Sequence, residues 1–172
     1  MAQPPLMSLD DADSVDAFLH VQTKRAGKIK GESTVSGQID DIIVKGWAWG
    51  LSASSALATE KSERRSYSVL TVHKLIDRAT TGWMAALATN DEVKEARLTM
   101  RRAGGEQEDF FIVTLKGARV SGVQHATDET GGTRETVSFA FTEVEVEYRL
   151  QKSSGGRGGS TVFTDNMPQA ES

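Results

Sequence analysis

The alternation of apolar and polar residues along this chain is the feature that most restricts its fold. Within residues 136–148, the apolar side chains fall on odd positions up to Phe141 and on even positions from Val144 onward. A period of two is typical of a β-strand with one buried face. The change of parity at Thr142-Glu143 predicts a bulge or a sharp bend in this long strand.

The same alternation recurs along most of the chain and predicts a mainly β fold of the α+β class. A short helix is predicted from Thr81 to about Ala88, with Thr80 as its cap. Many short strands with one helix favour a small β-barrel, or a sandwich, with the helix packed alongside. The predicted strands are Val15–Thr23, Ile39–Gly50, Tyr67–Leu75, Glu95–Arg102, Asp109–Lys116, Ala118–His125 and Thr136–Leu150.

Two segments lack this alternation. Ser52–Ser66 is rich in Ser and Ala and then charged, and a loop of this length inside a compact domain is usually functional, so we interpret it as a projecting contact loop. Ser153–Ser160 has the composition of a flexible linker. The predicted organisation is a flexible segment over residues 1–14, a β-barrel domain over 15–150 and a Gly/Ser-rich tail over 151–172.

Large apolar side chains occur on two strands in unusual patterns. Trp47 and Trp49 point to one face of a strand and small Ala48 to the other. We expect the tryptophans in the core or in a subunit interface rather than on an exposed carbohydrate-binding platform. Asp109–Leu115 is apolar on both faces, so a face that includes Phe110 and Ile112 needs a cover, either the helix or another subunit.

Composition excludes several kinds of chemistry. The chain has no cysteine, which rules out disulfides, thiolate zinc sites and cysteine nucleophiles. A net charge of −4 argues against a general nucleic-acid or anionic-membrane binder. The N-terminus lacks the pattern of a Sec-type signal peptide, no apolar run would span a bilayer, and we expect no membrane insertion and a start in the cytoplasm.

No catalytic, metal or cofactor motif stands out, and we predict a protein that is not an enzyme. The three histidines, His20, His73 and His125, fall on different predicted strands, so a shared metal site is conceivable without any spacing motif to favour it. The acidic face of Glu143, Glu145 and Glu147 could bind a cation, but a solvated stripe is the default interpretation. A monomeric β-barrel that binds a small apolar ligand is the alternative function.

A series of short motifs, in order, carries a resemblance. These are Lys-Gly-Glu-Ser at 30–33, Trp-Ala-Trp-Gly at 47–50, Leu-Ile-Asp-Arg-Ala-Thr at 75–80 and Ala-Arg-Leu-Thr-Met-Arg-Arg-Ala-Gly-Gly at 96–105. Each is weak alone, but together they resemble the Hcp family, the haemolysin-coregulated tube proteins of bacterial type VI secretion systems. The resemblance extends from roughly Ala17 to Leu150.

The resemblance implies a subunit of hexameric rings that stack into a hollow tube. Such a tube leaves the cytoplasm through the type VI system without a signal peptide, carries effector proteins in its lumen, and works with sheath, spike and baseplate proteins. Ala48 and Ser121 would face the lumen. The extended loop would contact a neighbouring ring through Glu60, Lys61, Glu63, Arg64 and Arg65.

Both ends of the chain depart from the family pattern. About a dozen extra residues precede the first strand, and the family's Gly-Trp-Asp-like ending is replaced by a segment whose only aromatic residue is Phe163. The details of ring stacking are the part of the resemblance that these departures affect.

Overall fold

A computed structural model describes residues 15–53, 65–102, 108–151 and 157–167 of this chain. The described part is mainly β with one helix, as the alternation predicted. Its elements are β1 (Val15–Thr23), β2 (Gly27–Ile29), β3 (Ile42–Val44), β4 (Gly46–Ala48), β5 (Leu51–Ala53), β6 (Arg65–Tyr67), β7 (Leu70–Leu75), α1 (Thr80–Ala88), β8 (Val93–Arg102), β9 (Asp109–Thr127), β10 (Thr133–Ala140), β11 (Glu143–Gln151) and β12 (Arg157–Asn166).

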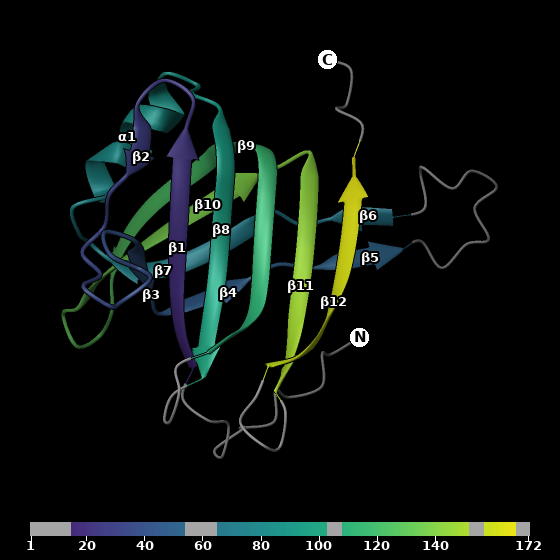
Figure 1. Ribbon diagram of the computed structural model, residues 1–172. Coiled ribbons are helices and arrows are strands. Elements are labelled where there is room, and N and C mark those ends of the chain that lie inside the picture. The colour runs from purple at the N-terminus through teal and green to yellow at the C-terminus, as the bar shows by residue number, and fades with distance from the viewer. Residues whose placement is uncertain (1–14, 54–64, 103–107, 152–156, 168–172) are drawn as a thin grey trace, which may run out of the picture.

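The strands form two layers that β9 connects (Figure 1). The first half of β9 lies between β8 and β11, and its second half pairs with β10. One layer contains β1, β8, β11 and β12, and the other contains β10, β7 and β4. The two strands predicted over Asp109–Lys116 and Ala118–His125 are therefore a single strand that passes from one layer into the other.

The bend between the layers lies at Gly117 and Thr142. Gly117 has a φ of +55°, a conformation that favours glycine. A Cβ atom at this position would overlap Oγ1 of Thr142. The Thr142 hydroxyl lies 3.3 Å from the carbonyl oxygen of Gly117, to which it donates. Because β10 ends at Ala140 and β11 begins at Glu143, the bend that the parity change predicted is confirmed.

A second change of layer brings the far edges of the two layers together. The predicted strand Ile39–Gly50 is in fact two short strands, β3 paired with β1 and β4 paired with β7. Only Lys45 separates them, and its N–H donates to the carbonyl oxygen of His73 at 2.8 Å. The hydrogen-bonded ladder is not continuous around the molecule, but the two layers enclose one core in a barrel-like arrangement.

The helix α1 covers one end of this core. Trp83 is fully buried, and its ring meets that of Phe139 edge-on with centroids 5.7 Å apart. The prediction that Thr80 caps the helix is wrong, because Ala79 holds the cap position and its own side chain makes no capping hydrogen bond. Thr80 is the first helical residue, and its hydroxyl donates to Oε2 of Glu135 at 2.6 Å. The Thr80 hydroxyl is therefore bonded to the buried carboxylate of Glu135 instead of to a backbone N–H group at the start of the helix.

Four strands were not predicted, and the longest of them, β12, begins inside the segment assigned to a flexible linker. Arg157–Ser160 belong to this strand, so the linker prediction is wrong for these residues. The ladder between β11 and β12 runs from Glu143 opposite Asn166 to Gln151 opposite Arg157. Pairing with β11 outweighs the weak strand preference of the glycines, an effect of tertiary context.

Candidate functional site

Small and polar side chains occupy the outward face of the layer made by β4, β7, β10 and the end of β9. Ala48 lies opposite Thr71, Thr71 opposite Ser138, and Ser138 opposite Gly122. The hydroxyls of Thr71 and Ser138 are 3.3 Å apart. We call this row the small-residue face, and it forms a low, hydroxyl-lined surface across four strands.

Ser121 joins the small-residue face through a bulge. Ser138 pairs with Gly122 and the next residue, Phe139, pairs with Val120, so Ser121 has no partner of its own in the ladder. Both Ser121 and Ala48 are exposed. The two residues that the resemblance assigned to a lumen therefore lie in the same outward-facing layer. Sequence reasoning did not identify Thr71 and Ser138, although the parity of their strands contained the signal.

Trp47 of β4, and Trp49 just after this strand, lie on the opposite side from Ala48. Trp47 stacks against Phe111 with ring centroids 6.3 Å apart, and Trp49 stacks against Tyr67 at 6.0 Å. Phe141 meets the rings of Trp49 and Tyr67 edge-on. Both tryptophans are half-buried and pack against the core.

Phe110 and Ile112 do not share a face as the alternation predicted. A bulge opposite Met100 and Arg101 leaves Phe110 without a ladder partner, and Phe110 packs against the core together with Phe111. Ile112 is 8% exposed but is not part of the core cluster. The bulge shifts one aromatic ring inward, a local irregularity that strict alternation does not reveal.

A two-stranded ribbon of β5 and β6 projects beyond the two layers (Figure 1). It carries the ends of the predicted contact loop, whose Glu60, Lys61, Glu63 and Arg64 lie outside the described residues. Arg65, the remaining residue of that prediction, is the first residue of β6. Its Nε donates to Oδ2 of Asp165 at 2.5 Å, and the hydroxyl of Tyr67 donates to the same oxygen at 2.8 Å. The ribbon is thus fastened to β12.

The contact between the ribbon and β12 shifts the pKa values of both Tyr67 and Asp165. Burial and the neighbouring Asp165 carboxylate raise the pKa of Tyr67 to about 12. The hydrogen bond from Tyr67, together with Arg65, lowers the pKa of Asp165. A lowered pKa keeps this carboxylate charged through the ordinary aspartate range of about 4, so the contact is lost only as the pH falls through the lower, folded value.

We expect Asp165→Asn to lower the pKa of Tyr67 toward the ordinary tyrosine value of about 10, because the substitution removes the negative charge that opposes ionisation of the phenol. The chain has two tyrosines, so the ultraviolet titration is followed in a Tyr148→Phe background, which leaves Tyr67 alone. An unchanged titration in the Asp165→Asn variant would show that burial by itself raises this pKa.

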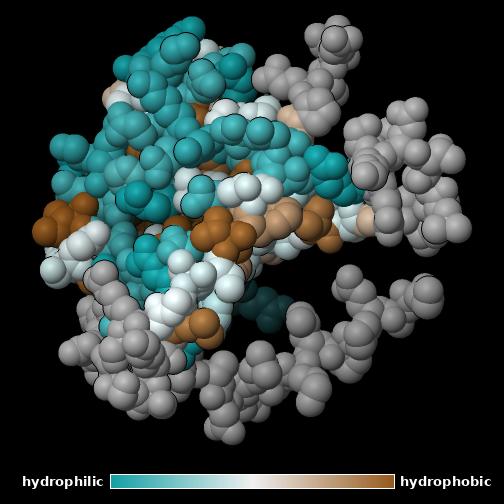
Figure 2. Space-filling model, turned by 45° about the vertical axis from the view of Figure 1, so that its right-hand side comes forward, coloured by the Kyte–Doolittle hydropathy of each residue, from teal (hydrophilic) through white to brown (hydrophobic). Residues whose placement is uncertain are grey.

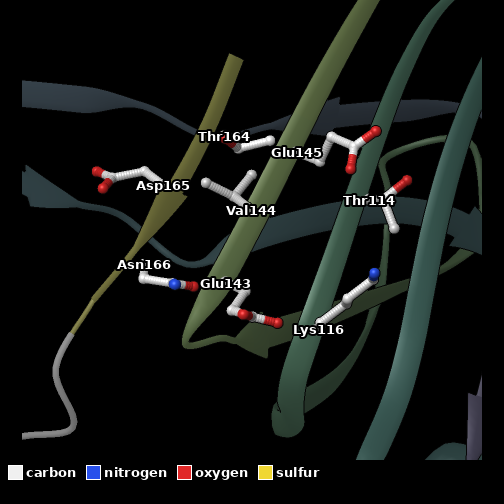
Figure 3. A pocket seen from close by; sticks show the side chains of 8 residues that line it. All are labelled: Thr114, Lys116, Glu143, Val144, Glu145, Thr164, Asp165 and Asn166. Atoms are coloured by element: carbon white, nitrogen blue, oxygen red, sulfur yellow. The ribbon is translucent and has the colours of Figure 1, made fainter. Parts of the chain in front are cut away.

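An open hollow lies on the outward face of β9, β11 and β12 (Figure 3). Glu143 faces Lys116 and Asn166 across the ladder, and Glu145 faces Thr114 and Thr164. The third acid of the predicted stripe, Glu147, accepts from Nε of Arg149 at 2.8 Å. The stripe is thus part of a surface of mixed charge. The described residues contain no group of three or more potential metal-binding His, Cys, Asp or Glu side chains.

The three histidines have separate surroundings. Nδ1 of His20 lies 3.0 Å from Oδ1 of Asp41, and Nδ1 of His73 lies 3.1 Å from the hydroxyl of Thr136. His125 is 3.9 Å from Oε2 of Glu135. A shared three-histidine site is therefore not formed.

Within the described ranges, no helix has the length and apolar character needed to cross a bilayer.

Comparison with known proteins decides the family. A sequence model described as "Type VI secretion system effector, Hcp" matches residues 18–148. The chain belongs to the Hcp family. Protein hcp1 of Pseudomonas aeruginosa is 33% identical to this Hcp chain over 156 residues, which cover 87% of the chain and 92% of that protein.

Solved Hcp structures share the fold of this chain. The crystal structure of Hcp1 from Salmonella typhimurium matches with a TM-score of 0.74 and 25% identity, covering 90% of this chain and 95% of that one. A structure described as a type six secretion system protein matches with the same TM-score and 27% identity, covering 86% and 92%. The chain therefore has the fold of solved Hcp proteins.

Proposed function

We propose that this Hcp chain is a non-catalytic subunit of the type VI inner tube, which forms hexameric rings that stack into a hollow, secreted tube and carry effector proteins in the lumen. The observation that carries the proposal is a pair of exposed apolar patches at opposite edges of the subunit. A closed ring needs two different, complementary surfaces on each copy, unlike a twofold dimer, which needs one.

The first patch, the β12 patch, lies on the β11–β12 edge. It consists of Tyr148, Leu150 and Phe163, which point to the same side of the β11–β12 ladder and are between 36% and 49% exposed, whereas Val162 points to the other side. Figure 2, which turns this side of the molecule forward, shows apolar side chains on its surface. Among the described strands β12 pairs only with β11, so its outer edge also offers unpaired backbone groups to another chain.

The second patch, the β7 patch, lies at the opposite edge (Figure 1). Ile43, Leu75 and Ile76 surround one surface hollow together with Glu32, Lys45 and Asp77, and the three apolar residues are 40% to 55% exposed. An apolar centre with a polar rim is typical of protein interfaces. The β12 patch of one copy against the β7 patch of the next gives the head-to-tail contact that a ring repeats.

The assembly is tested by the native mass of the purified protein, with negative-stain images of the same sample. We expect a particle of six times the 18.6 kDa subunit mass with an open centre.

Phe163→Glu should give folded monomers, because a charge in the contact would be buried without a partner. Leu87→Glu is the matched control, since Leu87 is 42% exposed on α1, outside both patches. A monomeric wild-type protein over a wide concentration range would contradict the proposal.

We propose that the small-residue face lines the lumen, where its short side chains leave space for cargo. We expect Ala48→Gln to leave rings intact and to reduce the amount of effector that co-purifies with them, because a long side chain would project from a low surface beside Thr71. Ala88→Gln, at an exposed position near the end of α1, is the control. Equal loss of effector in both variants, or loss of folding in Ala48→Gln, would contradict the assignment of this face.

The alternative of a ligand-binding barrel finds less support. The interior between the two layers is filled by fully buried side chains, among them Leu19, Leu98, Leu115 and Phe139.

Sheath, spike and baseplate proteins are the proposed partners of the tube, and the ribbon of β5 and β6 is the proposed start of the contact with the next ring. The cytoplasm is the proposed place of synthesis, and the type VI system the proposed route out.

A further inference from the structure

A groove on the side of the molecule between β2 and α1 has an apolar floor. Ile29 lies at its base, and α1 approaches so closely that a Cβ atom on Gly82 would stand 3.0 Å from Cγ2 of Ile29. Gly82, Ala85 and Ala86 line the helix side. The helix contains no charged residue, and Met84, Ala85, Leu87 and Ala88 are exposed, which is unusual for a helix at a protein surface.

Four cations line this groove, and three of them have no ion-pair partner among the described residues. Arg25, Lys30 and Arg78 line it and are exposed, and their side chains form no ion pair with any described residue. Lys28, the fourth cation of the lining, pairs with Asp41 at 2.9 Å, and neighbouring Lys24 pairs with Glu92 at 3.7 Å. The single acid of the groove, Asp91, is almost fully buried.

Asp91 offsets only part of the positive charge, since it is a single carboxylate among four cations and interacts with Arg25. Its two carboxylate oxygens accept from the backbone N–H groups of Arg25 and Ala26, at 3.0 and 3.2 Å. The groove therefore combines an apolar floor with a positive rim in a chain whose net charge is −4. The complementary ligand is an acidic segment that carries several large apolar side chains.

One stretch of this chain has that composition. Residues 1–14 contain Leu6, Met7 and Leu9, followed by Asp10, Asp11 and Asp13, with no lysine or arginine. The other stretches outside the described residues differ: 54–64 carries both signs of charge, and 103–107, 152–156 and 168–172 contain no large aliphatic or aromatic residue. Charge and apolar content thus select the N-terminal segment.

The reach of the chain favours a segment from another copy. Residue 15 begins β1, and β1 extends from there to Thr23, which lines the groove, a length of about 26 Å at about 3.3 Å per residue. Asp10 precedes Val15 by five residues and reaches about 18 Å from it at most. If the segment folded back on its own subunit, its aspartates would be too far from the groove to reach the cations at its rim.

We propose that the groove between β2 and α1 binds residues 1–14 of a second copy, with Leu6, Met7 and Leu9 on the apolar floor and the three aspartates at the rim of Arg25, Lys30 and Arg78. The inference rests on the proposed assembly, which brings another copy within reach. The segment then acts as a clamp that adds to the contacts between subunits.

Disulfide trapping tests this in the full-length chain, which has no cysteine of its own. A Leu9→Cys protein and an Ala85→Cys protein are mixed and oxidised, and linked pairs are measured after denaturation. We expect abundant linkage between the two variants. Ser66→Cys, exposed on β6 far from α1, replaces Ala85→Cys in the control and should give little linkage (Figure 1).

Charge exchange separates a specific contact from chance collision. Replacing Arg25, Lys30 and Arg78 by glutamate should reduce linkage about tenfold, the effect of three exposed ion pairs. Replacing Asp10, Asp11 and Asp13 by lysine in the partner should restore it. Native mass is recorded for each sample. Intact rings without this linkage, or linkage unaffected by the charge changes, would overturn the inference and leave the proposed function standing. Failure of rings and linkage together would overturn both.

Discussion

Trp83→Ala is expected to lower the free energy of unfolding by about 3–5 kcal/mol, the largest effect of any single apolar truncation in this protein. Trp83 is fully buried where α1 packs on the core, and its ring contacts Phe139 edge-on at 5.7 Å. Removing the indole leaves a cavity that the rigid β-layers cannot fill, and it detaches the helix from its main anchor. Chemical denaturation of the purified variant measures the loss.

Trp47→Ala is the matched control for this truncation. Trp47 is half-buried and stacked on Phe111 at 6.3 Å, so part of its surface remains in contact with water or with another subunit. We expect a clearly smaller loss than for Trp83→Ala in the isolated subunit. Equal losses would mean that the edge of the core beneath β4 is as closely packed as the centre beneath α1.

Lys74→Met is expected to destabilise the protein by about 3–5 kcal/mol, the cost of leaving a buried carboxylate without its cation. Nζ of Lys74 is fully buried and lies 3.0 Å from Oε2 of Glu135 and 2.8 Å from Oδ1 of Asp77. It also donates to the carbonyl oxygen of Leu75 at 2.9 Å. These bonds join β7, β10 and the turn that leads into α1, so the loss should also loosen the helix.

Two further variants identify the cause of that loss. Lys74→Met combined with Glu135→Leu should recover part of the stability, because an apolar pair of similar volume replaces a buried ion pair, while Asp77 still loses its cation and the Thr80 hydroxyl its acceptor. Lys24→Met removes an exposed pair with Glu92 and should change stability by about 1 kcal/mol or less. If the double variant were no more stable than Lys74→Met alone, lost packing rather than an unpaired charge would explain the effect.

Alternation predicted most of the long strands but not β12, because a strand with one buried face must alternate in any context, whereas β12 begins in a Gly/Ser-rich segment. β1 has the predicted bounds Val15–Thr23, and the break between β10 and β11 lies where the parity changes. The faces of β4 also followed from the residues alone, since the side chains of Trp47 and Ala48 must point in opposite directions. Short edge strands such as β2 and β5 were missed, because three residues contain too little pattern.

Bulges and long-range strand pairing limited how much of the candidate site could be predicted from the sequence. Phe110 and Ser121 each stand at a register shift, which depends on the partner strand as much as on their own. The partners of Ala48 across the layer, Thr71 and Ser138, come from distant parts of the chain. Tyr67 and Asp165 are 98 residues apart in the sequence, so their hydrogen bond could not be predicted from local pattern.

The sequence by itself determined the class of fold, the positions of most strands, the absence of cysteine chemistry and, through ordered motifs, the family. The tertiary structure alone decided that Arg157–Asn166 is a strand, that Lys74 and Glu135 form a buried pair, and that a positive rim surrounds the groove beside α1. The reason is physical: local pattern records which face of an element is buried, whereas charge pairs, edges and grooves exist only where separate elements meet.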